Sequence, residues 1–519
     1  MSERARRGAA SLLRYSPAAM LVAIAVADAT RFADPDLWGH LRFGQATLAH
    51  GHLTLSDPYS YSAFGLPWHN HEWLTEVLMA ALYNLFGVVG LKLWKFAMTA
   101  VTLIFVAVAM AETSASITLQ LLLMLAAALA LSPQLQFRPQ LFTFAFLSIL
   151  IAMLTRYNYR GRALLWLAIP MLALWANLHG GFIVGIATLG LFTIVIAAQD
   201  LLVHRGLRRA IYPGAITIAA IVATLLNPYG IGMWYAVGHA LANPFTRGAV
   251  SDWRPMGRAL VVQAHLAPLG IIYYGAVIAL LGGFVLSIVM APRGGDLPLI
   301  AVAIMMTAAA LLSVRNMALA VIAAAAPLAR HAELAMAAGR TADAADTAAP
   351  PPLRQAPVNQ LIMAAAAIAL AGYTGLFSGP LLDAGRYPVG AVAFMETHHL
   401  HGNLLCDFNW GEYLIWHLWP GSKVFIDGRY DTVYPEKVFD DYLTFYLNRP
   451  GAAEVLKRYP HDFVLIPIKC KAYLPMSANP GWKLIYHDAD AALFAPAGSP
   501  AAGIPEVPIS GTAPPNLFP

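Results

Sequence analysis

The sequence predicts a polytopic α-helical membrane protein with a small α/β domain at its C-terminus. Only 12% of the 519 residues are charged, where a soluble domain has about a quarter. The hydrophobic fraction is 59% and the mean hydropathy is +0.60, and so much apolar surface cannot be buried in a soluble core. Long apolar runs continue to residue 378, after which short β-rich runs alternate with helical patterns. Together these observations exclude a water-soluble multidomain enzyme.

The apolar runs predict about eleven membrane spans, because about 20 apolar residues cross a hydrocarbon layer of about 30 Å. The run at 73–90 is instead amphipathic and predicts an interfacial helix. A signal peptide competes with the first span, since Ala27-Asp28-Ala29 has the form of a cleavage site, but the Asp favours an uncleaved helix. The predicted spans are 17–29, 92–111, 117–135, 140–155, 163–178, 181–203, 210–226, 264–291, 297–313, 316–329 and 358–378.

The arginines predict the orientation of these spans, because loops rich in Lys and Arg remain in the cytoplasm. With eleven spans, the strong Arg clusters all fall on the side of the N-terminus, which is therefore cytoplasmic. The C-terminal domain then lies on the opposite side of the membrane, and the expected location is a bacterial inner membrane with this domain in the periplasm. The net charge of +5 does not indicate a nucleic-acid partner, since the arginines occupy short loops instead of one stripe. The clusters are 4–14, 156–162, 205–209, Arg293 and 330–354.

Three parts follow from this organisation. Residues 1–378 form a helical transmembrane domain with an external loop at 31–91 and a cytoplasmic linker at 330–358. Residues 379–496 form a soluble periplasmic α/β domain, and residues 497–519 are expected to be disordered. Strands are predicted at 403–407, 423–427, 462–467, 482–486 and 491–494, and helices at 409–418, 435–447 and 451–459.

Within the soluble domain, Asp407, Asp427 and Arg429 follow predicted strands, where α/β sheets usually present ligand groups. An equal alternative is that Asp427-Gly428-Arg429 forms a turn with an internal ion pair. The two cysteines, Cys406 and Cys470, allow a disulfide, but Cys406 lies in an apolar strand where a free thiol is an ordinary packing residue.

The loop after the first span concentrates the carboxylates. Asp34 and Asp36 follow that span directly, Asp57 lies 21 residues further on, and His71-Glu72 precedes the amphipathic run. A general base must lie within hydrogen-bond reach of its proton, and a metal ion needs two or three such oxygens or imidazoles. The loop supplies enough groups for either. Taken alone, Asp34-Pro35 and Asp57-Pro58 are also common turn formers.

Several motifs resemble bacterial membrane glycosyltransferases of the GT-C class, relatives of protein O-mannosyltransferases and aminoarabinose transferases. The resemblance covers the whole layout of first helix, long acidic loop, bundle and C-terminal domain. One departure is Gly39, where the resemblance leads us to expect a second Trp. The motifs lie at D34-P-D-L-W-G-H-L-R-F-G-Q45, S56-D-P-Y-S-Y-S62, W68-H-N-H-E-W-L-T-E76, L131-S-P-Q-L-Q-F-R-P-Q-L-F-T143, W175-A-N-L-H-G-G181, L226-N-P-Y-G230, R315-N316, G402-N-L-L-C-D-F-N-W-G-E-Y413 and F425-I-D-G-R429.

The resemblance implies an inverting transfer of a sugar from a polyprenyl-phosphate or polyprenyl-diphosphate donor to an extracytoplasmic lipid, polysaccharide or protein. It implies Asp36, or else Asp34, as the general base. Arg138 and Arg315 are the expected phosphate contacts, because arginine binds phosphate with two hydrogen bonds. The other expected substrate-binding residues are Asp57, His71, Glu72, His179 and Trp38.

Two other functions stay open. A transporter or flippase of a lipid-linked saccharide would show midplane polar residues and inverted repeats, and none is evident in the sequence. A non-catalytic protein of envelope polysaccharide assembly is the other alternative. The cofactor is not determined: a divalent cation such as Mg²⁺ or Mn²⁺ is compatible with the loop, with a ligand role for Glu72 less favoured. No organic cofactor is expected.

Overall fold

A computed structural model describes residues 33–161, 164–204, 206–242, 253–258, 268–338, 386–505 and 507–508. These residues form two compact units, which are described separately. The first unit contains the described residues of 91–237 and 242–338. The second contains 33–90, 238–241, 386–505 and 507–508. The predicted spans 17–29 and 358–378, most of the linker 330–358 and the end of the tail 497–519 lie outside the described residues.

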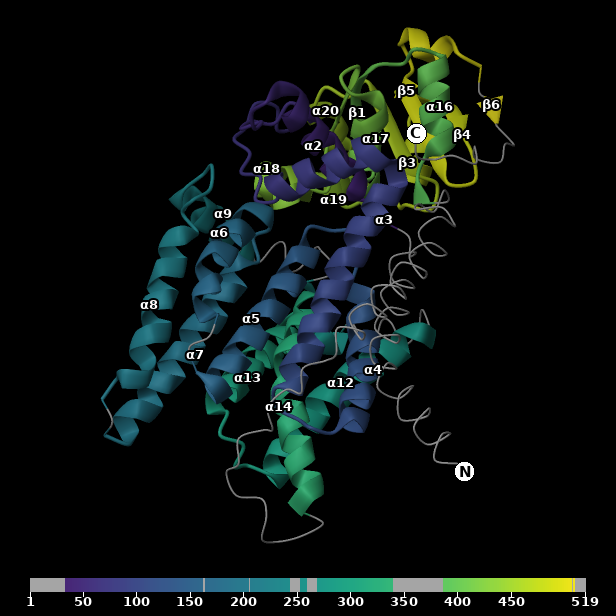
Figure 1. Ribbon diagram of the computed structural model, residues 1–519. Coiled ribbons are helices and arrows are strands. Elements are labelled where there is room, and N and C mark those ends of the chain that lie inside the picture. Colours follow the sequence, from purple (N-terminus) through teal and green to yellow (C-terminus); the bar gives the residue numbers. More distant parts are fainter. Residues whose placement is uncertain are drawn as a thin grey trace. The chain divides into compact units, whose positions relative to one another are not determined.

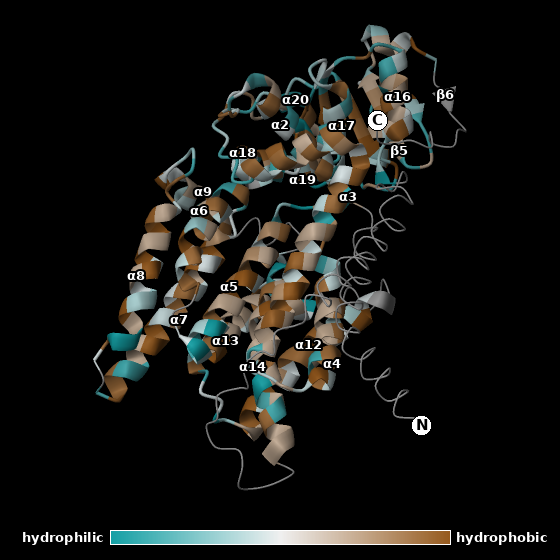
Figure 2. Ribbon diagram, viewed as in Figure 1, coloured by the Kyte–Doolittle hydropathy of each residue, from teal (hydrophilic) through white to brown (hydrophobic). Residues whose placement is uncertain are grey.

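The first unit is built from apolar helices (Figure 1). Among the described residues, six helices are long and apolar enough to cross a membrane: Trp73–Ala111, Ile117–Gln134, Gln140–Arg160, Phe182–Leu202, Gly270–Met290 and Val314–Ala338. Figure 2 shows these helices coloured mainly as hydrophobic. The polytopic membrane class predicted from the sequence is therefore confirmed. The helices are α3 (Trp73–Ala111), α4 (Ile117–Leu131), α5 (Gln140–Arg160), α6 (Ala168–Leu178), α7 (Phe182–Leu202), α8 (Arg208–Ala223), α9 (Ile231–Ala242), α12 (Pro268–Met290), α13 (Leu297–Leu312) and α14 (Met317–Ala338), with short 3₁₀ turns η1 (Ser132–Gln134), η2 (Leu165–Leu167) and η4 (Val314–Asn316).

Helix α3 is interrupted at Gly87, whose φ of 58° and ψ of −146° are not helical. Glycine alone adopts such a conformation without strain, because it has no Cβ. The interruption lies close to the predicted border between the interfacial helix 73–90 and the span 92–111. The residues of α3 up to Gly90 belong to the second unit.

Several of the predicted arginine clusters meet at one end of the first unit. Arg156 and Arg160, in the last turns of α5, both bind the buried Glu112. The hydroxyl of Tyr157 donates to the carbonyl of Arg209, and the amide of Asn158 donates to Gly295, close to Arg293. The loops after α5, α7 and α12 therefore lie together at this end of the first unit.

The second unit contains a six-stranded sheet in the order β2-β1-β3-β5-β4-β6. Strand β1 is parallel to β2 and β3, whereas β5 is antiparallel to β3 and β4. This confirms the predicted α/β fold of the C-terminal residues, and each predicted strand and helix overlaps an observed one. The strands are β1 (Gly402–Cys406), β2 (Ser422–Val424), β3 (Phe463–Pro467), β4 (Trp482–His487), β5 (Ala491–Pro496) and β6 (Val507–Pro508); the helices are α16 (Val389–Thr397), α17 (Gly411–Leu418), α18 (Tyr430–Val433), α19 (Glu436–Tyr446), α20 (Ala452–Arg458) and α21 (Tyr473–Ser477), with η6 (Phe408–Trp410) and η7 (Pro500–Gly503).

The acidic loop that precedes α3 folds together with this sheet. The backbone N–H of Tyr61 donates to Val424 of β2 at 3.1 Å, and the N–H of Val424 donates to Tyr59 at 3.2 Å. Ser60 thereby forms a parallel bridge at the β2 edge. Helix α2 (Leu37–His50) also packs on α17. The loop and the C-terminal residues therefore form one unit, although the sequence assigned 31–91 to the helical domain.

Candidate functional site: a buried cluster of carboxylates

The site begins at the first turn of α2. The side chain of Asp34 accepts a hydrogen bond from the N–H of Asp36 at 3.2 Å, and the Asp34 carbonyl accepts one from Leu37 at 3.1 Å. Asp34 thus stabilises the turn that starts the helix, as an Asx turn does. Asp36 occupies the N-cap position without capping the helix through its side chain. The two candidate bases therefore differ in structure.

Glu412, from the first turn of α17, lies beside Asp36. Its Oε2 accepts a hydrogen bond from the backbone N–H of Gly39 at 3.1 Å. A Cβ on Gly39 would lie 2.2 Å from the same oxygen, and a Cβ on Gly428 would lie 2.6 Å from Asp36 Oδ1 and 2.7 Å from Glu412 Oε1. Both carboxyl groups therefore border Gly428, and only glycine leaves room for them. The same contact explains why Gly39 stands where a Trp was expected.

The surroundings of Glu412 favour its protonated form. Burial raises the pKa of Glu412 well above 4.5, and the charges of Asp36, Asp427 and Glu76 raise it further, whereas Arg429 opposes them. Two carboxyl groups in one site repel each other when both are ionised, so a proton is retained on one of them. The pair can therefore offer a carboxylate next to a carboxylic acid.

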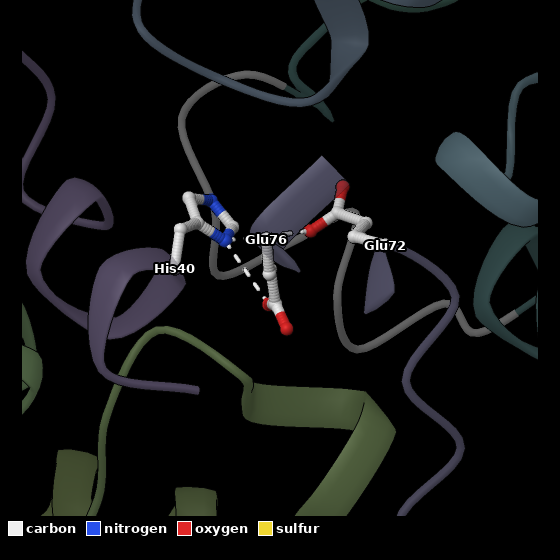
Figure 3. A group of neighbouring side chains, drawn as sticks. All are labelled: His40, Glu72 and Glu76. Carbon is white, nitrogen blue, oxygen red and sulfur yellow. Dashed lines mark hydrogen bonds and ion pairs between the residues drawn. The ribbon is translucent and has the colours of Figure 1, made fainter. Parts of the chain in front are cut away.

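A second group lies one helical turn along α2 from Asp36. His40 Nδ1 lies 3.2 Å from Glu76 Oε1 and 4.0 Å from Glu72 Oε2 (Figure 3). Burial alone would lower the pKa of His40, but the hydrogen bond to Glu76 and the charges of Glu72, Glu76 and Asp36 outweigh it and raise the pKa to about 9. His40, Glu72 and Glu76 form a triad. One nitrogen and two carboxylate oxygens of this triad lie within 4.8 Å of one another, a spacing compatible with a metal ion.

Asp57, predicted to bind substrate, lies in a third group centred on Arg429. Arg429 donates to Asp57 Oδ1 at 2.8 Å and to both oxygens of Asp427 at 2.8 and 2.6 Å. Tyr434 donates to Asp427 at 2.6 Å. The guanidinium lies over the rings of Phe43, Tyr59, Trp68 and Tyr434. The Asp427-Gly428-Arg429 turn thus contains the internal ion pair that was one of the two sequence alternatives, and Asp57 ties the loop to it.

Trp38 is completely buried, with 0% of its surface exposed. Its ring contacts Tyr387, Tyr413, Trp416 and His417 at centroid distances of 5.1–5.9 Å. This burial favours packing between α2 and α17 over the sugar contact that the sequence suggested.

His71 and Glu72 lie at the edge of the triad. His71 Nε2 is 3.6 Å from Glu72 Oε1, and both side chains are partly exposed.

Cys406 and Cys470 are both free thiols.

Three predicted substrate-binding residues belong to the first unit. Arg138 precedes α5, and Arg315 lies in η4, where it stacks on Trp253 at 5.3 Å. His179 ends α6; its Nδ1 lies 2.7 Å from Thr143 Oγ1 and accepts from the N–H of Gly181 at 2.9 Å. Their contact with a donor phosphate stays a prediction.

Sequence reasoning missed Glu412, His40 and Glu76. Two of them have a signal in the sequence: His40 follows Asp36 by four residues, and Glu76 follows Glu72 by four. Residues four apart lie on one face of a helix. Glu412 has no such signal toward Asp36 and Gly39, since both are more than 370 residues away.

No protein-family model and no curated protein matches the sequence. Solved structures do match. An oligosaccharyltransferase from Archaeoglobus fulgidus, tethered to an acceptor peptide containing the NVT sequon, has a TM-score of 0.54 at 11% identity, over 88% of this chain and 69% of that chain. The archaeal oligosaccharyltransferase AglB from the same organism, in complex with an inhibitory peptide and a dolichol-phosphate, has a TM-score of 0.53 at 11% identity and the same coverage.

A mutant form of the arabinofuranosyltransferase AftD from Mycobacteria has a TM-score of 0.50 at 16% identity, over 93% of this chain and 41% of that chain. These neighbours are glycosyltransferases of the GT-C class, so the chain has the GT-C fold that the sequence motifs indicated. At these identities the likeness concerns the fold.

Proposed function

We propose that this protein is a membrane glycosyltransferase. It transfers a sugar from a polyprenyl-phosphate or polyprenyl-diphosphate donor to a lipid, polysaccharide or protein acceptor outside the cytoplasm. The observation that carries the proposal is the position of Asp36, at the start of α2 and beside Glu412, in a chain with the GT-C fold. A complex of one neighbour with a dolichol-phosphate supports the class of donor.

Asp36 is the proposed general base. Its carboxylate takes the proton of the acceptor hydroxyl or amide as that atom forms a bond to the anomeric carbon. The bond from that carbon to the donor phosphate breaks, and the phosphate leaves with the electron pair. Because attack and departure occur on opposite faces of the sugar, one displacement inverts the anomeric carbon. A positioned base of this kind contributes about 10²–10⁴-fold to a rate.

Glu412 is a positioning residue in this proposal. As a carboxylic acid it adds no charge beside Asp36, so Asp36 keeps the ionised form that a base requires. Its hydrogen bond from Gly39 also fixes α17 against the first turns of α2. Arg138, Arg315 and His179 are proposed to contact the donor phosphate.

The orientation follows from the arginines. We place the end of the helical unit that carries Arg156, Arg160 and Arg209 in the cytoplasm of a bacterial cell. The C-terminal domain is then periplasmic, and the protein lies in the inner membrane. The gathering of these loops at one end of the unit supports this assignment.

The test compares Asp36→Asn with Asp34→Asn in a strain that lacks the gene. Glycolipids and glycoproteins of the complemented strains are analysed by mass spectrometry, and the protein level in membranes is checked. We expect Asp36→Asn to lose the product, with a decrease on the order of 10²–10⁴ in rate, while Asp34→Asn retains most of it. Full product with Asp36→Asn would remove this residue from the mechanism, and an unchanged glycan profile in the deletion strain would contradict the proposed function.

A further inference from the structure

The triad of His40, Glu72 and Glu76 has the composition of a metal site. Imidazole nitrogen and carboxylate oxygen are the ligands of zinc, and both also bind manganese. His40 lies in α2, Glu76 in the first turn of α3, and Glu72 directly before α3, so the tertiary fold brings them together. His40 and Glu76 are 7% and 3% exposed, and the side chain of Glu72 is 17% exposed. One side of the group thus remains open for a solvent ligand.

The distances fit an ion after a small adjustment. With bonds of about 2.0–2.2 Å, neighbouring ligands of a tetrahedral ion lie about 3.3–3.6 Å apart. His40 Nδ1 is 3.2 Å from one Glu76 oxygen and 4.0 Å from one Glu72 oxygen. No spacing among the three ligand atoms exceeds 4.8 Å, and the longer of the two His40 distances is to the partly exposed Glu72 side chain.

A further side chain holds both carboxylate residues in place. The amide of Asn70 donates to Glu76 Oε2 at 2.5 Å, and its carbonyl oxygen accepts from the backbone N–H of Glu72 at 3.0 Å. His71 Nε2 lies 3.6 Å from the Glu72 oxygen that faces away from His40. Metal ligands are usually oriented by such partners.

Charge also favours a cation. The two glutamates lie around one imidazole in a region that also contains Asp36, so a single His40 cannot offset all three carboxyl groups, and burying carboxylates without compensation is costly. A divalent ion neutralises both glutamates. We infer that His40, Glu72 and Glu76 bind one divalent transition-metal ion of the zinc or manganese type, with Asn70 as a residue that orients the ligands. This inference does not depend on the proposed transfer reaction.

The experiment measures metal binding directly. The full-length protein is purified in detergent, stripped with a chelator and incubated separately with Zn²⁺, Mn²⁺ or Mg²⁺. Bound metal is counted by mass spectrometry, and Tm is followed by intrinsic fluorescence. We expect one Zn²⁺ or Mn²⁺ ion per chain and a higher Tm with the ion than without it. Mg²⁺ should bind more weakly, because it prefers oxygen ligands alone.

Glu72→Gln removes one ligand at a partly exposed position and should abolish binding and the rise in Tm. Glu436→Gln makes the same chemical change at an exposed position of the same unit and should behave as the wild type. Asn70→Ala should retain the site but bind the ion about 10–100-fold more weakly. The proposal is overturned if the wild type binds no ion, or if Glu72→Gln binds as much as the wild type. Metal counts in Asp36→Asn, expected to be normal, separate this result from any loss of transfer.

Discussion

Two groups of carboxyl residues in the second unit differ in their surroundings. In the group around Arg429, each oxygen of Asp57 and Asp427 accepts at least two hydrogen bonds. In the group around Asp36, carboxyl groups from α2 and α17 border the same glycine, and Glu412 is kept protonated. A fully compensated group stabilises a fold, whereas groups with perturbed protonation are characteristic of functional sites.

In our proposal the Arg429 group stabilises the unit and the Asp36 group performs chemistry in it. Both groups join the acidic loop to the C-terminal residues. Arg429 reaches Asp57 across 372 positions of sequence, and Glu412 reaches Gly39 across 373. The Arg429 group therefore stabilises the structure that supports the Asp36 group.

The largest effect on stability is expected for Arg429→Met. This change leaves the buried carboxylates of Asp57 and Asp427 without their cation and should cost about 3–5 kcal/mol. Arg429→Lys should not restore the loss, because Lys lacks the planar fork that binds Asp57 and Asp427 together. Thermal or chemical unfolding of the detergent-solubilised protein measures the change.

Arg449→Met is the matched control for this substitution. Arg449 is half-exposed and lies 3.8 Å from the exposed Asp440, and surface ion pairs of this kind contribute about 0–1 kcal/mol. If Arg429→Met were as mild as Arg449→Met, the structural role assigned to the Arg429 group would be wrong.

A smaller loss is expected for Gly39→Ala. Because the new Cβ would lie 2.2 Å from Glu412 Oε2, the Glu412 carboxyl group would have to move away from the N–H of residue 39 that it binds, and overpacking of this kind costs about 1–3 kcal/mol. The displaced carboxyl group would also crowd Asp36, so transfer should fall more than stability. Gly498→Ala, in the same unit and with open space around its Cβ position, should leave both measurements unchanged. Equal behaviour of the two variants would contradict the close contact.

Much of the fold could be predicted from the sequence, because apolar periodicity and β-rich runs are local signals. The strand predicted at 462–467 is observed at Phe463–Pro467, and the helix predicted at 435–447 is observed at Glu436–Tyr446. The membrane class followed in the same way from composition.

The site was predictable only in part. Asp36 stands in a recognisable motif, but its neighbour Glu412 is brought to it by the packing of α2 on α17, which no local pattern encodes. Asp57 had the same motif-based support as Asp36, yet it lies in the compensated group. A motif can thus identify a carboxylate of interest without showing whether an arginine neutralises it.

The smallest effect on stability is expected for Glu412→Gln, and it depends on pH. A carboxyl group whose pKa is raised by folding stabilises the protein while it is protonated, and that contribution is lost as the pH rises through the raised value. Burial and the neighbouring Asp36 raise the pKa of Glu412 well above 4.5. At pH values where Glu412 is protonated, the neutral and isosteric Gln should therefore change stability by less than about 1 kcal/mol.

At higher pH the wild type must either ionise Glu412 beside Asp36 and Asp427 or separate these groups, and its stability should fall. The Gln variant has no proton to lose at this position, so its stability should fall less over the same range. Unfolding measured for both proteins between pH 5 and pH 10 compares them, and Glu436→Gln, at an exposed position, should follow the wild type. Parallel curves for wild type and Glu412→Gln, together with a loss of stability in Glu412→Gln at pH 5, would mean that Glu412 is already ionised in the folded protein. The Asp36 group would then be compensated like the Arg429 group. The distinction between a structural group and a catalytic group would have to rest on Asp36 alone.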